Sequence, residues 1–168
     1  HGGEKIGVIG MGSSVIGAKP EEEIIATVRG AMERGVNFFD MAGGHAAIFE
    51  AYGKALEGRR EKAYLQVHFG ADYTSGEYGW TTKLAEVKAS VKWQLEKLRT
   101  DYIDFGFIHC LDEEKDLADY RKNGVLDYVQ EMKARGVVRH IGLSSHTPVL
   151  VNRVLDMGIV DIVMFSVN

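Results

Sequence analysis

Short apolar runs alternate along the chain with longer segments whose apolar residues recur every three or four positions. The short runs predict β-strands, and the longer segments predict amphipathic helices. Strands are expected at 6–11, 36–40, 63–69, 102–109, 140–144 and 161–167, and helices at 20–34, 49–56, 82–99, 125–135 and 148–157. Strands that alternate with helices form βαβ units, so the pattern favours an α/β fold built on a parallel sheet.

The strand runs are almost purely apolar, which is typical of strands that are covered on both faces. Polar residues and glycines gather instead just after the carboxyl ends of these runs. They are Gly12, Ser13, Asp40, His68, His109, Ser144, Ser145 and Asn168. In parallel α/β folds that edge of the sheet carries the chemistry, so these residues are the first candidates for a functional site.

The composition is that of an ordinary globular chain. Of 168 residues, 45% are hydrophobic and 26% charged, and the net charge is −4. The apolar fraction excludes intrinsic disorder, and the slight excess of acid argues against a nucleic-acid partner. No apolar run approaches the roughly 20 residues that cross a bilayer, so no membrane partner is expected. The single cysteine, Cys110, cannot form an internal disulfide, which favours a reducing, cytoplasmic location.

The glycine-rich start of the chain offers one alternative fold. Gly10 and Gly12 match the first two glycines of the G-x-G-x-x-G dinucleotide fingerprint, and Asp40 could serve as its acidic partner. The third glycine position holds Val15, however, and the next helix signal comes only at Pro20. The fingerprint requires a helix that begins inside the glycine run, so this reading is disfavoured.

Three segments resemble the aldo-keto reductase superfamily. They are 35–42 together with 52–56, then 90–109, and then 136–145. The second is the most specific, because a long helix leads into Asp-Tyr-Ile-Asp and a strand that ends at His109. The resemblance implies an α/β (β/α)8 TIM barrel, cytosolic and metal-free, that passes hydride from NADPH to a small-molecule carbonyl substrate. NAD in place of NADP stays open.

The length is short for such a barrel. A complete barrel needs roughly 250 residues, whereas this chain has 168 and reaches what would be the sixth strand. We therefore expect one aldo-keto-reductase-like domain over 1–168, with about six βα units and the C-terminal part of the barrel absent. The chain also begins at His1 rather than Met, and no secretory signal is visible.

The resemblance implies four catalytic positions at the barrel mouth. Asp40 matches the family's Asp, and His109 matches its substrate-orienting His. His45 stands where the family has its proton-donating Tyr, and His68 stands where it has a Lys. The positions expected to bind the cofactor are Gly12, Ser13, Asp40, Ser144, Ser145 and Met164. Among these, Ser145 replaces the usual Asn and Met164 the usual Gln.

The two replacements fit one acid–base hypothesis. A phenol with a pKa near 10 needs a nearby cation to donate a proton at neutral pH, whereas an imidazole with a pKa near 6.5 does not. We therefore expect His45 to act as the general acid. In this hypothesis His109 positions the carbonyl, while Asp40 and His68 tune the proton donor. Carbonyl reduction should then be favoured on the acid side of neutrality.

Three other functions stay open from the sequence. Asp40, His45, His68 and His109 could together hold a metal ion. The altered catalytic positions could mark a non-catalytic NADP(H)-binding regulatory protein. The third is an oxidoreductase whose electrons come from an iron–sulfur group in an absent C-terminal part, because some relatives carry a cysteine-rich segment there; this chain does not show that segment.

Several further residues have a plain structural interpretation. The aromatic stretch Tyr73, Tyr78 and Trp80 could be a substrate lid or packing over the mouth. The acidic run at 112–116 is expected to be a solvated loop, and Cys110 a small core residue.

Overall fold

Six parallel strands form the centre of the molecule, in a computed structural model that describes residues 3–166. They are β1 (Met11–Gly12), β2 (Phe38–Asp40), β3 (Tyr64–Phe69), β6 (Ile103–Ile108), β7 (Val138–Ser144) and β8 (Ile162–Met164). Their order in the sheet is the order in which they occur in the chain. A doubly wound dinucleotide-binding sheet reverses its strand order, so this topology excludes the Rossmann alternative. The sheet curls into part of a (β/α)8 barrel.

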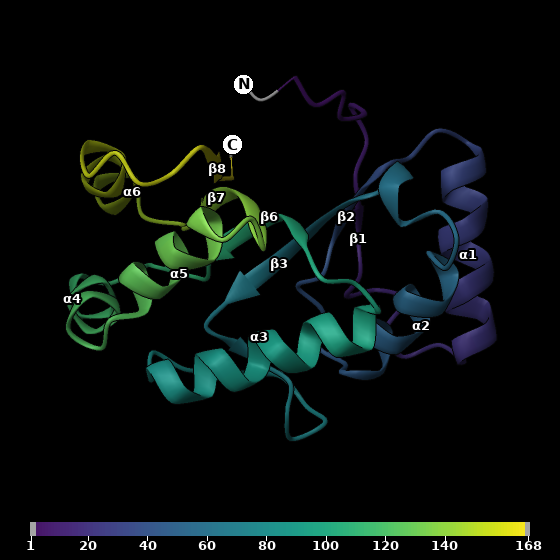
Figure 1. The fold of residues 1–168 in the computed structure, drawn as a ribbon, viewed down its shortest axis with the longest axis horizontal. Coiled ribbons are helices and arrows are strands. Elements are labelled where there is room, and N and C mark those ends of the chain that lie inside the picture. The colour runs from purple at the N-terminus through teal and green to yellow at the C-terminus, as the bar shows by residue number, and fades with distance from the viewer. Residues whose placement is uncertain (1–2, 167–168) are drawn as a thin grey trace.

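Helices cover the outside of this sheet. They are α1 (Glu21–Glu33), α2 (Ala47–Ala55), α3 (Leu84–Leu98), α4 (Glu114–Lys122), α5 (Val125–Ala134) and α6 (Pro148–Asp156), with a short 3-10 turn at Arg60–Lys62. In Figure 1 the strands lie in the middle, with α1 and α2 on one side and α4, α5 and α6 on the other. The helices predicted at 20–34, 49–56, 82–99, 125–135 and 148–157 are all present within a few residues.

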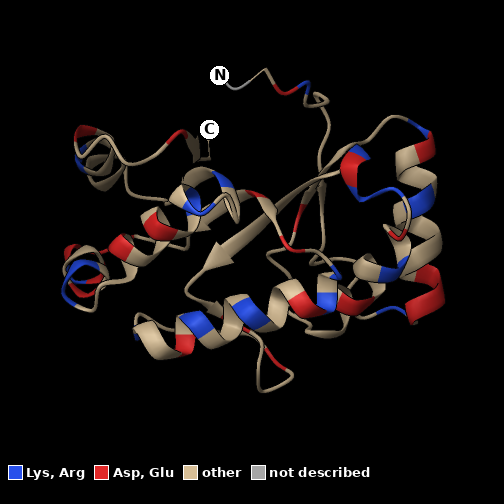
Figure 2. Ribbon diagram, viewed as in Figure 1, with Lys and Arg blue, Asp and Glu red and all other residues tan. Residues whose placement is uncertain are grey.

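The charged residues follow this layering. Figure 2 shows Lys and Arg mixed with Asp and Glu along α1 and α3, whereas the ribbon of β3 carries no charge. Between the layers lies one apolar core, which includes Val28, Phe39, Phe49, Leu65 and Val129. The apolar stripe of each helix therefore faces the sheet, as its sequence period predicts.

The first predicted strand is wrong in its position. Only Met11 and Gly12 pair with β2, whereas Val8 and Ile9 lie outside any strand and are exposed. An apolar run here does not mark a buried strand. The last predicted strand is correct through Met164, and its final residue, Val167, lies outside the described residues, as does Asn168.

The acidic run at 112–116 is not the solvated loop that the sequence analysis expects. It starts α4, whose N-cap is Glu113. The carboxylate of Asp116 accepts a hydrogen bond from the Glu113 backbone N–H at 3.0 Å, which forms half of a capping box. Acidic side chains at a helix start also oppose the positive end of its dipole. The charges therefore begin a helix rather than solvate a loop.

A small hairpin between β3 and α3 was missing from the predicted elements. Its strands are β4 (Ala71–Asp72) and β5 (Gly79–Trp80), which pair antiparallel. The turn between them is held by Asp72, whose Oδ1 accepts hydrogen bonds from the Thr74 backbone N–H at 3.0 Å and side chain at 2.8 Å. This hairpin extends the loop that follows β3 and carries the aromatic residues Tyr78 and Trp80.

The amino end of β6 holds a buried charge cluster. The carboxylate of Asp104 lies 2.8 Å from Arg60 Nη2 and 2.9 Å from Arg139 Nη1, and it accepts a hydrogen bond from the Leu65 backbone N–H at 3.0 Å. Both guanidinium groups lie over the ring of Tyr102, at 4.1 and 4.2 Å. Since these partners come from the turn before β3, from β3 itself and from β7, Asp104 ties three strands together at this end.

Candidate active site

The strand alternation decides which side chains reach the candidate site. Successive residues of a strand point to opposite faces, so every second residue shares a face. Phe38 and Asp40 share one face of β2, as Gln66 and His68 do in β3. In β6 the same face carries Phe105 and Phe107, and the alternation continues to His109 just beyond the strand. The ring contacts Phe38–Phe105, at 5.7 Å, and His68–Phe107, at 5.8 Å, confirm that this face is shared between strands.

One glycine makes room on this face. A Cβ at Gly142 in β7 would lie 2.4 Å from the ring of Phe107, so only glycine leaves space for the ring. Phe107 in turn pairs with His68 on the neighbouring strand, and the two rings are in contact with 5.8 Å between centroids. His68 therefore packs against an aromatic side chain at the carboxyl edge of the sheet.

Asp40, His68 and His109 form a continuous hydrogen-bonded chain there. His68 Nε2 lies 2.7 Å from Asp40 Oδ1, and His68 Nδ1 lies 3.0 Å from His109 Nδ1. The other ring nitrogen of His109, Nε2, lies 2.9 Å from the hydroxyl of Tyr78. His68 and His109 are buried, while 21% of the Asp40 side chain is exposed. The fold thus brings together three of the four predicted catalytic residues and adds a tyrosine.

Burial governs the protonation of this chain. Removal from water and, to a smaller extent, the neighbouring His68 together lower the pKa of His109 to about 3. His109 is therefore a neutral imidazole at neutral pH, with one nitrogen that donates and one that accepts. Burial also raises the pKa of the Tyr78 hydroxyl, so Tyr78 carries its proton at neutral pH.

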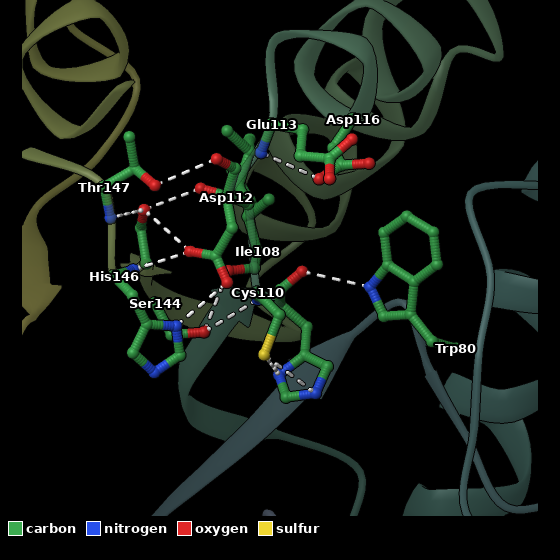
Figure 3. A network of polar contacts seen from close by, with 12 residues as sticks. Trp80, Ile108, Cys110, Asp112, Glu113, Asp116, Ser144, His146 and Thr147 are labelled. Carbon is green, nitrogen blue, oxygen red and sulfur yellow. Dashed lines mark hydrogen bonds and ion pairs between the residues drawn. The ribbon is translucent and has the colours of Figure 1, made fainter. Parts of the chain in front are cut away.

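The backbone at His109 is fixed by its neighbours. The His109 carbonyl accepts hydrogen bonds from the Tyr120 hydroxyl at 3.1 Å and from the Trp80 indole N–H at 3.3 Å. Figure 3 shows the Trp80 ring reaching across to this segment. The next residue, Cys110, has a left-handed backbone with φ of 46° and places its sulfur 3.5 Å from His109 Nε2. Cys110 is half-buried beside the site rather than a core residue, and burial raises the pKa of its thiol.

His45 lies outside the chain of hydrogen bonds. It is exposed and forms an isolated antiparallel bridge with Glu77. Its ring packs over Gly17, where a Cβ would lie 3.0 Å from His45 Cδ2. Within residues 3–166 no hydrogen bond joins His45 to Asp40, His68 or His109.

Gly12 and Ser13, predicted to bind the cofactor, lie beside Asp40. Gly12 pairs with Asp40 in the sheet, and the Ser13 backbone N–H donates to the Asp40 carbonyl at 3.1 Å. The Ser13 hydroxyl is buried and has no partner among the described residues. A Cβ at Gly12 would meet nothing within 4 Å, so the space in front of this residue is open.

Ser144 and Ser145 are engaged in contacts between loops. Ser144 Oγ accepts a hydrogen bond from the Cys110 backbone N–H at 3.1 Å. Ser145 Oγ donates to the Leu111 carbonyl at 2.6 Å and lies 3.2 Å from Asp112 Oδ1. Figure 3 shows the contacts of Asp112 with His146 and Thr147 of the loop after β7. Both serines therefore fasten the loop after β7 to the loop after β6.

Met164 borders an open hollow of about 510 Å³ between the two edges of the sheet. Asp40, Gly12 and Gln66 line the same hollow. The amide of Gln66 lies with Nε2 3.2 Å from His68 Nε2 and 3.6 Å from Met164 Sδ. Its oxygen is buried and has no partner among residues 3–166. Three of the predicted cofactor-binding residues thus share one cavity.

Two further properties concern the described residues. Across 3–166, no three His, Cys, Asp or Glu side chains are grouped in a way that could hold a metal ion. In the same range, no helix combines the length and the apolar character needed to cross a bilayer.

Comparison with known proteins places the chain in a family. The model of the Aldo/keto reductase family matches residues 7–168. The chain belongs to the aldo/keto reductase family. Among its relatives, L-galactose dehydrogenase of Arabidopsis thaliana is 31% identical over 96% of this chain and 53% of its own length. This aldo-keto reductase chain thus spans about half the length of the curated relatives it matches.

Solved structures agree with the fold. The aldo-keto reductase AKR11C1 of Bacillus halodurans, in its holo form, has a TM-score of 0.76 and 25% identity over 95% of this chain and 53% of its own. An aldo-keto reductase of Klebsiella pneumoniae, solved in complex with NADPH, has a TM-score of 0.61 and 22% identity over 83% of this chain and 45% of its own. This confirms the predicted incomplete (β/α)8 barrel.

The sequence analysis missed two residues of this aldo-keto reductase site. Tyr78 was grouped with a possible lid, and its contact with His109 depends on a hairpin that no local pattern predicts. Gln66 lies in a strand whose other residues are mostly apolar, but it comes two residues before His68 and so shares its face. The alternation rule that placed Asp40 above Phe38 could have found Gln66.

Proposed function

We propose that this aldo-keto reductase is an oxidoreductase that moves hydride between NADP(H) and a small carbonyl or alcohol substrate. Family membership supports the reaction class. One relative is named as a dehydrogenase of L-galactose, and one structural neighbour was solved with NADPH. The substrate class we assign is accordingly a small molecule that carries a carbonyl or hydroxyl group.

The observation that carries the proposal is the Asp40–His68–His109 chain at the carboxyl edge of the sheet. Hydride transfer to a carbonyl carbon leaves a negative oxygen that must receive a proton. In this series the Asp40 carboxylate lies 2.7 Å from His68 Nε2, and His68 Nδ1 lies 3.0 Å from Nδ1 of the neutral His109. Such a series can hold a proton at one end and release it at the other.

The lining of the hollow fits the nicotinamide end of the cofactor. Gln66 keeps one polar atom of its buried amide without a partner in the described chain, and a nicotinamide carboxamide offers both a donor and an acceptor. Gln66, Gly12 and Met164 would border that group, while Asp40 would lie beside it. When bound, the cofactor supplies or accepts hydride. The protein residues orient the two reactants and manage the proton.

The role of His45 as general acid stays a prediction. Its exposed ring has no hydrogen bond to the Asp40–His68–His109 series. His109, in contrast, contacts His68 through one ring nitrogen and Tyr78 of the hairpin through the other. We therefore assign to His109 a part in handling the proton that the carbonyl oxygen receives. The metal-dependent alternative gains no support from the arrangement of the histidines, since their facing nitrogens are engaged with one another.

The test uses the product of the complete reading frame that encodes this chain. Purified protein is mixed with NADPH and a panel of aldehydes and ketones, and NADPH oxidation is followed by absorbance. We expect turnover on part of the panel, and His109→Ala should lower kcat by about 100-fold or more. His146→Ala is the matched control, because His146 is exposed on the loop after β7, and it should stay within about threefold. Tight NADP(H) binding without any turnover would instead support the regulatory alternative.

A further inference from the structure

Tyr78 contacts the ring nitrogen of His109 that does not face His68. The sequence lacks the family's tyrosine after β2, where His45 stands. A tyrosine nevertheless reaches the site from the hairpin, with its hydroxyl 2.9 Å from His109 Nε2. Tyr78 is 45% exposed, so the hairpin leaves this residue partly open to solvent.

We propose that Tyr78 is the catalytic residue that exchanges a proton with the substrate oxygen, and that His109, His68 and Asp40 form the relay behind it. This inference rests on the proposed function and adds the identity of the proton donor.

The facing nitrogens of His68 and His109 allow two arrangements of protons. The two Nδ1 atoms lie 3.0 Å apart, so one must donate and the other accept. In the first arrangement, His109 Nδ1–H donates to His68, His68 Nε2–H donates to the Asp40 carboxylate, and the Tyr78 O–H donates to His109 Nε2. In the second, His68 is an imidazolium that donates to both Asp40 and His109. His109 Nε2–H then donates to the Tyr78 oxygen, which frees the Tyr78 proton.

His109 is neutral in both arrangements, which agrees with its burial. The two arrangements differ by one proton, and that proton sits on His68, next to the Asp40 carboxylate. The second arrangement is ready for carbonyl reduction because the Tyr78 O–H is free to donate. The first is ready for alcohol oxidation because the relay can accept a proton.

The proton and electron balance of reduction is complete. Hydride from bound NADPH forms the new C–H bond at the carbonyl carbon, and the C=O π electrons move to oxygen. That oxygen takes the proton of Tyr78, and Tyr78 takes the proton of His109 Nε2. His109 Nδ1 takes the proton from His68 Nδ1, so His68 changes from imidazolium to neutral imidazole. NADPH is oxidised, the carbonyl is reduced to an alcohol, and oxidation follows the same steps in reverse.

The hairpin holds Tyr78 at this distance by two further contacts. Two residues along, the Trp80 indole donates to the His109 carbonyl at 3.3 Å, so the hairpin grips both the ring and the backbone of His109. On its other side the Tyr78 ring packs against Tyr73, with 5.8 Å between ring centroids. Tyr78 is therefore positioned by packing as well as by its hydroxyl.

The first test is kinetic. It uses the protein encoded by the complete reading frame, NADPH and a carbonyl compound that the wild type reduces. Tyr78→Phe should lower kcat by about 100-fold or more while the Kd for NADPH changes less than twofold. Tyr128→Phe is the control, since it removes a tyrosine hydroxyl on α5, outside the sheet and away from His109. It should stay within about threefold. A Tyr78→Phe variant with wild-type kcat would overturn the proton-donor role and leave the proposed function standing.

A spectroscopic test does not depend on turnover. The ring nitrogens of His109 are observed by long-range proton–nitrogen NMR in the cofactor-free protein. Tyr78→Phe should shift the His109 Nε2 resonance, and Tyr128→Phe should not. An unchanged His109 spectrum in Tyr78→Phe would overturn the relay. Absence of turnover in the wild type on every carbonyl and alcohol tried would overturn the proposed function, and the Tyr78 role with it.

Discussion

His68 is the residue on which the candidate site depends most. It contacts a carboxylate through one ring nitrogen and a second imidazole through the other, and it is buried. A lysine at this position would place a permanent cation next to His109. An imidazole can instead donate in one state and accept in another, which a relay requires.

The burial of His109 predicts a particular pH dependence of stability. Its pKa is about 3 in the folded protein and about 6.5 in an unfolded chain, so on acidification the unfolded chain binds the proton first. Stability from this group is therefore present above about pH 6.5 and is lost as the pH falls toward 3. The loss is at most about 1.4 kcal/mol per pH unit.

The measurement is urea unfolding of wild type and His109→Asn at several pH values between about 7 and 4. The difference in unfolding free energy between the two proteins should shift against the wild type as the pH falls. Parallel curves for the two proteins would show that His109 is not held neutral by burial.

At the level of residues, the sequence predicted part of the site. Asp40, His68 and His109 follow from strand ends and alternation, because parallel strands place their carboxyl ends at one edge. His45 was assigned from its spacing after Asp40, but spacing in a loop does not fix where a side chain points. Tyr78 depends on a hairpin docked on a distant residue, which no local pattern encodes.

At the level of elements, α4 offers a test of the capping contact. Asp116→Ala removes the carboxylate that accepts the Glu113 backbone N–H, and it should lower the free energy of unfolding by about 1 kcal/mol. Urea unfolding measures the change. Lys122→Ala, in the last turn of the same helix, is the comparison and should cost less. Equal losses in the two variants would mean that the capping contact adds nothing specific.

The helices were easier to predict than the short elements. A helix such as α3 is predicted by its long apolar stripe. In α4 only Leu117 and Tyr120 are buried, so its sequence has no such stripe. β1 consists of two residues, and its position is set by pairing with β2 rather than by its own apolar run. Tertiary contacts, not local preference, decide such elements.

At the level of the whole molecule, Asp104 should be a main determinant of stability. Asp104→Ala leaves Arg60 and Arg139 without their buried partner and frees the Leu65 backbone N–H. We expect a loss of about 3 kcal/mol in the free energy of unfolding. Because this cluster lies at the end of β6 remote from His109, kcat per folded molecule should stay within about twofold. A loss of activity in fully folded Asp104→Ala would contradict this separation.

The fold as a whole was predictable because strand–helix alternation leaves few topologies, and the resemblance selected the barrel among them. Sequential strand order and the family match confirm that choice. The cytoplasmic location expected from a lone cysteine stays a prediction.

The division of labour along β6 has a practical outcome for protein engineering. At the amino end of β6, Asp104 binds Arg60 and Arg139 and stabilises the sheet. At the carboxyl end, His109 lies at an edge of the sheet that is surrounded by loops. Libraries that randomise the exposed residues 74–77 of the β4–β5 turn can therefore explore new substrates while Tyr73, Tyr78 and the Asp104 cluster stay in place.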